Sequence, residues 1–177
     1  MKPTAKIISY VFHPLLLATY LVFLLHWFLP RFLLLPEKAF MTFVALVFIM
    51  TFVLPVANIL MFRAFGSLPS LQMESRRERL LPFTLITIIY AVVTIMFFYK
   101  LGRNVNFNKV MCIVALLVLV ATAATFFLKI SVHSLAMAGA LGVMIPLNKV
   151  VTDGSLLNAT LALLTLAGVV MSSRLYL

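Results

Sequence analysis

Apolar runs recur along the whole chain, and they limit its fold more strictly than any other feature. The hydrocarbon core of a bilayer is roughly 30 Å thick and a helix rises about 1.5 Å per residue, so about 20 helical residues cross it. The composition agrees, because 64% of the residues are hydrophobic and 10% are charged, whereas about 25% of a soluble domain is charged. The sequence therefore predicts an all-α integral membrane protein, a polytopic transmembrane helical bundle.

Short polar or proline-containing breaks divide the apolar sequence into about six predicted spans. Their approximate bounds are 5–29, 39–62, 82–99, 110–128, 134–147 and 156–171. Pro14 in the first span predicts a kink, and Pro55 in the second predicts a kink whose freed backbone groups an adjacent helix satisfies. No segment is long and polar enough for a separate soluble domain, so residues 1–177 are predicted to form a single transmembrane helical domain.

The formal net charge of +10 comes from basic residues that gather at the ends of the predicted spans. This placement is typical of membrane topology and of contact with anionic lipid headgroups. No basic stripe with interleaved aromatic residues is present, so nucleic acid is not expected as a partner. Six spans would put Lys2, the loop before Arg76, Lys129 and Arg174 on one side of the membrane.

The segment Lys129-Ile-Ser-Val-His-Ser134 carries a cation, a hydroxyl and an imidazole within a few residues. Lys129 and His133 are four apart, which puts them on one face if the segment is helical, and Ser131 adds a hydroxyl donor. The three groups could therefore converge on one bound anion. The alternative for His133 is a polar residue at a helix start, bonded to a neighbouring loop.

The most charged segment precedes the third span. Ser75-x-x-Glu78 has the form of a capping box, so a helix is expected to start there, with Arg76 and Arg79 on one face. Arg77 lies between them. We expect this cluster, residues 129–133 and Arg174 to form one polar site on one side of the membrane.

Three sequence elements, in this order, resemble the signatures of the type 2 phosphatidic acid phosphatase superfamily. The basic loop ending at Pro82 is similar to the first signature, Lys-x6-Arg-Pro. Lys129-Ile-Ser-Val-His133, followed by small residues, is similar to the second, Pro-Ser-Gly-His before an Ala-rich helix. Ser173-Arg174 resembles the start of the third, Ser-Arg-x5-His.

The resemblance implies a site that works without metal or other cofactor. His133 would be the general acid, and the histidine of the third signature would attack phosphorus. Phosphate would be held by basic and hydroxyl side chains, namely Arg76, Arg77, Arg79, Lys129, Ser131 and Arg174.

The chain departs from the family pattern at several positions. Ile130 and Val132 stand where the second signature has proline and glycine, and Leu81 stands where the first has arginine. The attacking histidine, counted from Arg174, would fall beyond Leu177. We expect either that a nucleophile and one more helix follow the given sequence, which we favour, or that this relative has lost catalysis.

The sequence thus predicts a lipid phosphate phosphatase-like protein of a bacterial inner membrane. Its substrate would be a phospholipid or a polyprenyl phosphate or diphosphate, hydrolysed by metal-free, histidine-based phosphoryl transfer. The alternative is a non-catalytic membrane subunit or lipid-binding scaffold of a larger complex, with membrane proteins as partners. His13 lies in the first span without a carboxylate or second histidine at metal-ligand spacing, so a packing role is expected for it.

Overall fold

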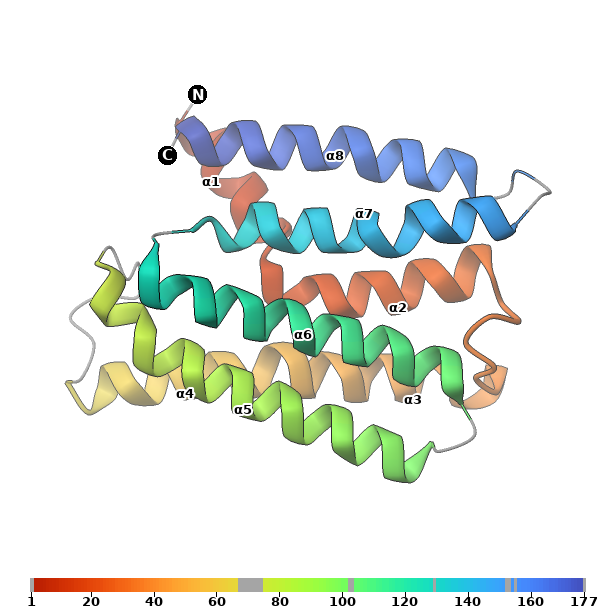
Figure 1. Cartoon of the computed structure of the whole chain (residues 1–177), viewed down its shortest axis with the longest axis horizontal. Helices are drawn as coiled ribbons and strands as arrows, with labels where there is room; N and C mark the ends of the chain where they lie inside the picture. The colour runs from red at the N-terminus through yellow and green to blue at the C-terminus, as the bar shows by residue number, and fades with distance from the viewer. Residues whose placement is uncertain are drawn as a thin grey trace. The chain divides into compact units, whose positions relative to one another are not determined.

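The computed structural model describes residues 2–66, 75–101, 104–128, 130–151, 154 and 156–176, and all regular structure among them is helical (Figure 1). The all-α prediction is confirmed. Five helical stretches in this part of the chain are long and apolar enough to cross a membrane: Thr4–Phe28, Glu37–Ala64, Arg76–Lys100, Val105–Phe127 and Leu157–Leu175. The chain is therefore built as an integral membrane protein.

The predicted span 134–147 lies within helix α7, Val132–Val150, which is not among these five. Its alanines and glycines add little hydropathy, and His133, Asn148 and Lys149 make its ends polar. The described residues thus hold five sufficiently apolar helices where about six were expected.

Two helices begin before the predicted membrane spans that they contain. Helix α5, Arg76–Lys100, starts at the predicted capping box, because the Ser75 hydroxyl accepts the Glu78 N–H (3.3 Å), and it continues through Pro82. That predicted helix start is confirmed. Helix α6, Val105–Phe127, starts before residue 110, because the Asn104 side chain accepts the Phe107 N–H (3.2 Å) and is the N-cap.

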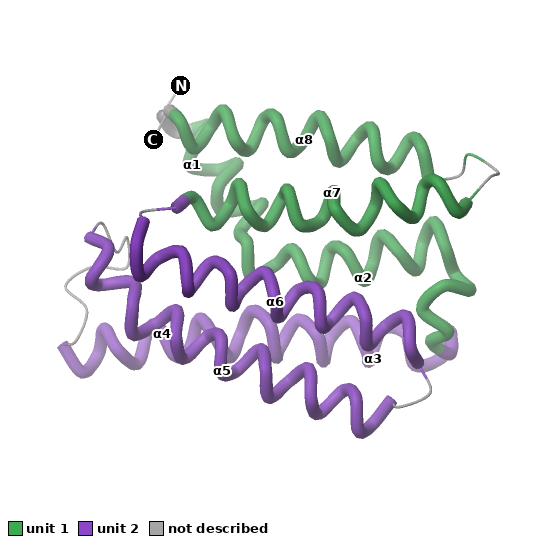
Figure 2. The backbone as a smooth tube through the Cα atoms, viewed as in Figure 1, with its two compact units in different colours: residues 1–35, 131–177 green, residues 36–130 purple. Residues whose placement is uncertain are grey.

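The chain forms two compact units, which Figure 2 distinguishes by colour. Unit 1 comprises Met1–Leu35 and Ser131–Leu177, and unit 2 comprises Pro36–Ile130. Each is described by itself below, and the single transmembrane domain stays a prediction.

Unit 2 consists of a long interrupted helix and a helical hairpin. The long helix is α3, Glu37–Phe48, followed by a π turn, η2, Ile49–Val53, and α4, Leu54–Ala64. Helices α5 and α6 run antiparallel beside each other (Figure 1). Buried aromatic rings join the elements, and Phe97 of α5 meets Phe107 of α6 edge to face with centroids 5.1 Å apart.

The π turn follows from Pro55. A proline has no N–H, so the carbonyl of Thr51, four residues earlier, cannot accept the usual α-helical bond. The Tyr90 hydroxyl of α5 donates to that carbonyl at 2.8 Å, and both residues are buried. The predicted bond from an adjacent helix is thus present, and the helix passes Pro55 with a π turn, whereas the kink itself stays a prediction.

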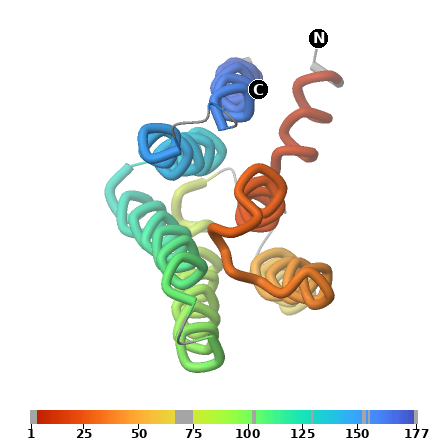
Figure 3. Tube along the Cα trace, turned by 90° about the vertical axis from the view of Figure 1, so that its right-hand side faces the viewer, coloured from red at the N-terminus to blue at the C-terminus, as the bar shows by residue number. Residues whose placement is uncertain are grey.

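Unit 1 contains α1, Lys2–Val11, the short 3₁₀ turn η1, Pro14–Leu16, and α2, Leu17–Phe28. It also contains α7 and α8, Leu157–Tyr176, which run antiparallel beside each other (Figure 1). Helix α1 turns away from the direction of α2 and packs against α8 (Figure 3). The start of α7, the end of α8 and the corner between α1 and η1 therefore meet at one end of this unit.

Large apolar side chains remain exposed on the helices of both units. Trp27 is 72% exposed, and Tyr99 and Phe127 are 82% and 79% exposed. Such surfaces are unfavourable in water and are expected where helices face lipid.

Candidate functional site

The predicted site residue Ser131 lies at the N-cap of α7. Its hydroxyl oxygen accepts the Ser134 N–H at 3.4 Å and lies 3.1 Å from the Ser134 hydroxyl, which donates to it. Satisfying a free N–H of the first turn is what an N-cap serine does. Ser131 thus has a structural role here, and its role in binding phosphate stays a prediction.

His133 follows in the first turn of α7. Its ring contacts helix α1 and His13, which follows that helix. The Nε2 atom lies 3.1 Å from the backbone carbonyl oxygen of Ser9. The His13 ring meets the His133 ring edge to face, with centroids 5.8 Å apart and planes at 75°. His133 thus lies at a helix start, as the alternative to a catalytic role supposed, but it bonds to a backbone carbonyl of helix α1 and not to a loop. It is also paired with a second histidine.

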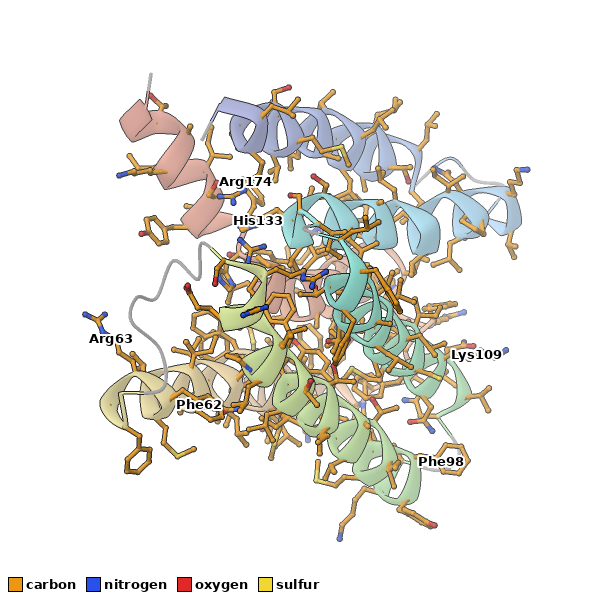
Figure 4. The ribbon with its side chains drawn as sticks, turned by 60° about the vertical axis from the view of Figure 1, so that its left-hand side comes forward. Phe62, Arg63, Phe98, Lys109, His133 and Arg174 are labelled. Atoms are coloured by element: carbon orange, nitrogen blue, oxygen red, sulfur yellow. The ribbon has the colours of Figure 1, made fainter. Side chains whose placement is uncertain are left out.

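Arg174 lies in the last turn of α8, close to His133 (Figure 4). Its Nε atom is buried and has no hydrogen-bond partner among the described residues. The Ser9 hydroxyl is likewise buried without a partner among them. The preceding Ser173 donates its hydroxyl to the Val170 carbonyl at 2.7 Å, so it serves its own helix. Buried donors without partners near an imidazole could bind an anionic oxygen.

The charges of this end of unit 1 also favour an anion. His133 precedes the expected span 134–147, and burial lowers the pKa of its ring, with Arg174 lowering it further and the Ser9 carbonyl opposing the change. The sequence of unit 1 contains one acidic side chain, Asp153, which follows α7 and lies outside the described residues. No third metal-ligating side chain joins the histidine pair in the described part of the chain.

The arginine cluster begins α5 in unit 2. Arg76 donates to the carbonyl of Phe127 at 3.0 Å, and Arg79 donates to the carbonyl of Ile130 at 3.4 Å. These carbonyls lie at and just after the end of α6, where helical carbonyls lack partners and a cation is favoured. The two arginines therefore bond to the chain between Phe127 and Ile130, directly before Ser131 in the sequence.

The predicted site residues are divided between the two units. Arg76, the exposed Arg77 and Arg79 belong to unit 2, whereas Ser131, His133 and Arg174 belong to unit 1. Lys129 lies outside the described residues. Within unit 1 the structure brings His133 and Arg174 together, and the single site formed by all of these residues stays a prediction.

Two residues that contact His133, namely Ser9 and His13, were not predicted from the sequence as parts of the site. His13 was assigned a packing role, and Ser9 had no assigned role. The signal for His13 was an ionisable residue followed by proline inside an apolar span. Ser9 contributes its backbone carbonyl. Every residue has this group, so the sequence gives no signal for it.

The chain was compared with protein-family models, with curated proteins and with solved structures, and none of them matches it. The function therefore has to be argued from the residues and their geometry.

Proposed function

We propose that the chain is a lipid phosphate phosphatase-like protein of a bacterial inner membrane. Its substrate would be a membrane lipid that carries a phosphate or diphosphate, either a phospholipid or a polyprenyl phosphate. The proposal rests on the three elements that resemble the signatures of the type 2 phosphatidic acid phosphatase superfamily.

The observation that supports this proposal best is the proximity of His133 and Arg174. They come from the elements that resemble the second and third signatures, and the antiparallel pairing of α7 and α8 puts them at one end of unit 1 (Figure 4). A general acid and a phosphate-binding cation need this proximity, because the acid must reach the oxygen that leaves the phosphorus.

The proposed chemistry is metal-free phosphoryl transfer. A histidine attacks phosphorus and forms a phosphoenzyme, Arg174 stabilises the charge on the phosphoryl oxygens, and His133 protonates the leaving oxygen. The attacking histidine would be the one that the third signature supplies. Arg76, Arg77, Arg79, Lys129 and Ser131 are proposed to bind the phosphate.

A second candidate is a non-catalytic membrane subunit or lipid-binding scaffold. It is favoured by the contacts of Arg76 and Arg79, whose guanidinium groups already bond to backbone carbonyls. The Ser131 hydroxyl is similarly used as a helix cap. These residues support the fold without any ligand.

The test is phosphate release by the purified full-length gene product in lipid nanodiscs. A panel of phosphatidic acid, phosphatidylglycerol phosphate and polyprenyl phosphates and diphosphates would be supplied as substrates. Alongside it we would assay H133A and R174Q. R63Q serves as the matched control, because Arg63 is an exposed arginine at the end of α4 (Figure 4).

We expect release by the full-length protein, a fall of about 10²–10⁴-fold in H133A, a comparable loss in R174Q, and no effect of R63Q. If a folded full-length preparation hydrolyses none of the lipids, the enzyme proposal fails and the scaffold remains. Binding of the same lipids without hydrolysis would favour that second candidate.

A further inference from the structure

Pro14 breaks the first predicted span close to a backbone acceptor of the His133 ring. Proline disfavours the helical conformation of the residue before it, and His13 is accordingly extended, with φ −63° and ψ 133°. Helix α1 ends at Val11, so Ser9 lies in its last turn. His133 bonds to the Ser9 carbonyl there at 3.1 Å.

This contact determines which nitrogen of His133 carries a proton. A carbonyl oxygen can only accept a hydrogen bond, so the Nε2 atom facing it must be the N–H donor. A neutral imidazole has one N–H, and its other nitrogen is then a free base. For His133 that basic atom is Nδ1.

The same break also positions the His13 ring against His133. The Nδ1 atom of His13 accepts the Leu15 N–H at 3.3 Å, which ties the ring to the start of η1. Held there, the ring packs edge to face on His133, 5.8 Å between centroids. Edge-to-face packing of this kind fixes the orientation of the partner ring.

We propose that the corner between α1 and η1 positions His133 for proton transfer: the Ser9 carbonyl fixes the Nε2–H form, the His13 ring fixes the ring plane, and Nδ1 exchanges the proton. The last clause rests on the proposed function. Nδ1 takes a proton from the lipid phosphate as it binds and gives that proton to the leaving oxygen as the P–O bond breaks. It then takes a proton from the water that hydrolyses the phosphoenzyme and releases it with the phosphate product, which restores the neutral ring. His13 and Ser9 are positioning residues, since they act through His133.

The test is nitrogen NMR of the full-length protein in nanodiscs with ¹⁵N-labelled histidine. Residues 1–177 hold three histidines, so signals are assigned by single substitutions at each of them. In the wild-type protein near neutral pH we expect a protonated, pyrrole-type Nε2 and an unprotonated, pyridine-type Nδ1 for His133. The opposite assignment would overturn the proposal without any assay of activity.

Two variants separate the contributions of the corner. P14A lets α1 continue through His13, which moves the Ser9 carbonyl and the His13 ring relative to His133, so the Nε2–H form of His133 should lose population. H13A removes the packed ring and should broaden the His133 signals through ring motion, whereas H13F keeps a packed ring and should restore them. His133 signals that stay unchanged in both P14A and H13A would contradict the proposal.

The controls use neighbours that leave the contacts in place. S9A keeps the backbone carbonyl and should leave the His133 tautomer unchanged. H26F alters a histidine well along α2 and should change neither the His133 signals nor phosphate release. If the protein proves active, P14A and H13A should lower kcat by about 10-fold with KM nearly constant, and H13F should recover kcat. An inactive protein with the expected tautomer would reject the proposed function and retain the positioning of His133.

Discussion

At the scale of single residues, two backbone carbonyls shortly before a proline bond to a side chain of another helix. His133 bonds to the Ser9 carbonyl, five residues before Pro14, and Tyr90 donates to the Thr51 carbonyl, four residues before Pro55. In hydrocarbon an unpaired carbonyl is costly, so each break needs a donor from another helix. Each of these carbonyls near a proline therefore depends on a hydrogen-bond donor from another helix, here His133 or Tyr90.

The Tyr90 contact gives a prediction for stability. Y90F removes the donor to the Thr51 carbonyl while keeping the buried ring, so the carbonyl loses its partner. We expect the free energy of unfolding to fall by about 1–2 kcal/mol, measured by reversible unfolding in micelles or bicelles. Y99F is the matched control, because Tyr99 lies on the same helix and is 82% exposed. Equal effects of the two variants would contradict the assigned role.

The sequence indicated Pro55 as a kink but could not identify its partner. Tyr90 is far from Thr51 in sequence, and only the packing of α5 against η2 brings them together. The same applies to His13. The sequence around it does not show that its ring packs against His133, and only the fold brings the two together. Residue types and spacing predict local breaks, whereas the groups that satisfy those breaks depend on tertiary structure.

At the scale of elements, polar side chains inside the apolar helices join neighbouring helices. Between α5 and α6 the hydroxyls of Thr87 and Thr122 lie 2.7 Å apart. Thr122 also donates to the Phe83 carbonyl across the pair at 3.2 Å. Between α7 and α8 the Asn148 amide donates to the Thr160 hydroxyl at 2.8 Å. Such bonds fix the position of one helix along its neighbour, because apolar contacts alone allow several registers of nearly equal energy.

A double-mutant cycle tests the α5–α6 contact. T87V, T122V and the double variant should show a coupling free energy of about 0.5–1.5 kcal/mol, the range found for hydrogen bonds between membrane helices. The control cycle combines T122V with T84V, since the exposed Thr84 hydroxyl bonds to Leu80 of its own helix. A coupling near zero in the first cycle, or one of equal size in the control, would contradict the interhelical bond.

The elements themselves were largely predictable, and the reasons for the errors are local. The bounds of the long helix from Glu37 to Ala64 follow from apolar length, and the structure agrees with the predicted 39–62. The start of α5 at the Ser75 capping box was predicted, whereas the third membrane span was begun only at Pro82, although a membrane helix tolerates proline in its interior. The start of α6 was placed too late because Asn104 looked like part of a turn, whereas it caps the helix.

At the scale of the whole molecule, α7 decides how many times the chain crosses the membrane. Its hydropathy leaves it outside the five helices that qualify by composition. Its 19 residues correspond to about 28 Å of helix, enough to cross the hydrocarbon core. It also runs antiparallel beside α8, which does qualify, and a helix shielded by neighbours needs less apolar surface of its own. We therefore expect α7 to cross the membrane together with α8.

Cysteine accessibility tests this topology. In a C112S background, S131C and G154C place single thiols at the two ends of α7, where both native residues are exposed. A membrane-impermeant maleimide should label one of them in right-side-out vesicles and the other only in inverted vesicles. Labelling of both thiols from the same side would show that α7 does not cross. The start of α7, with His133, and the loop after it would then lie on one face of the membrane, which would reject the six-span topology from which the single polar site was predicted.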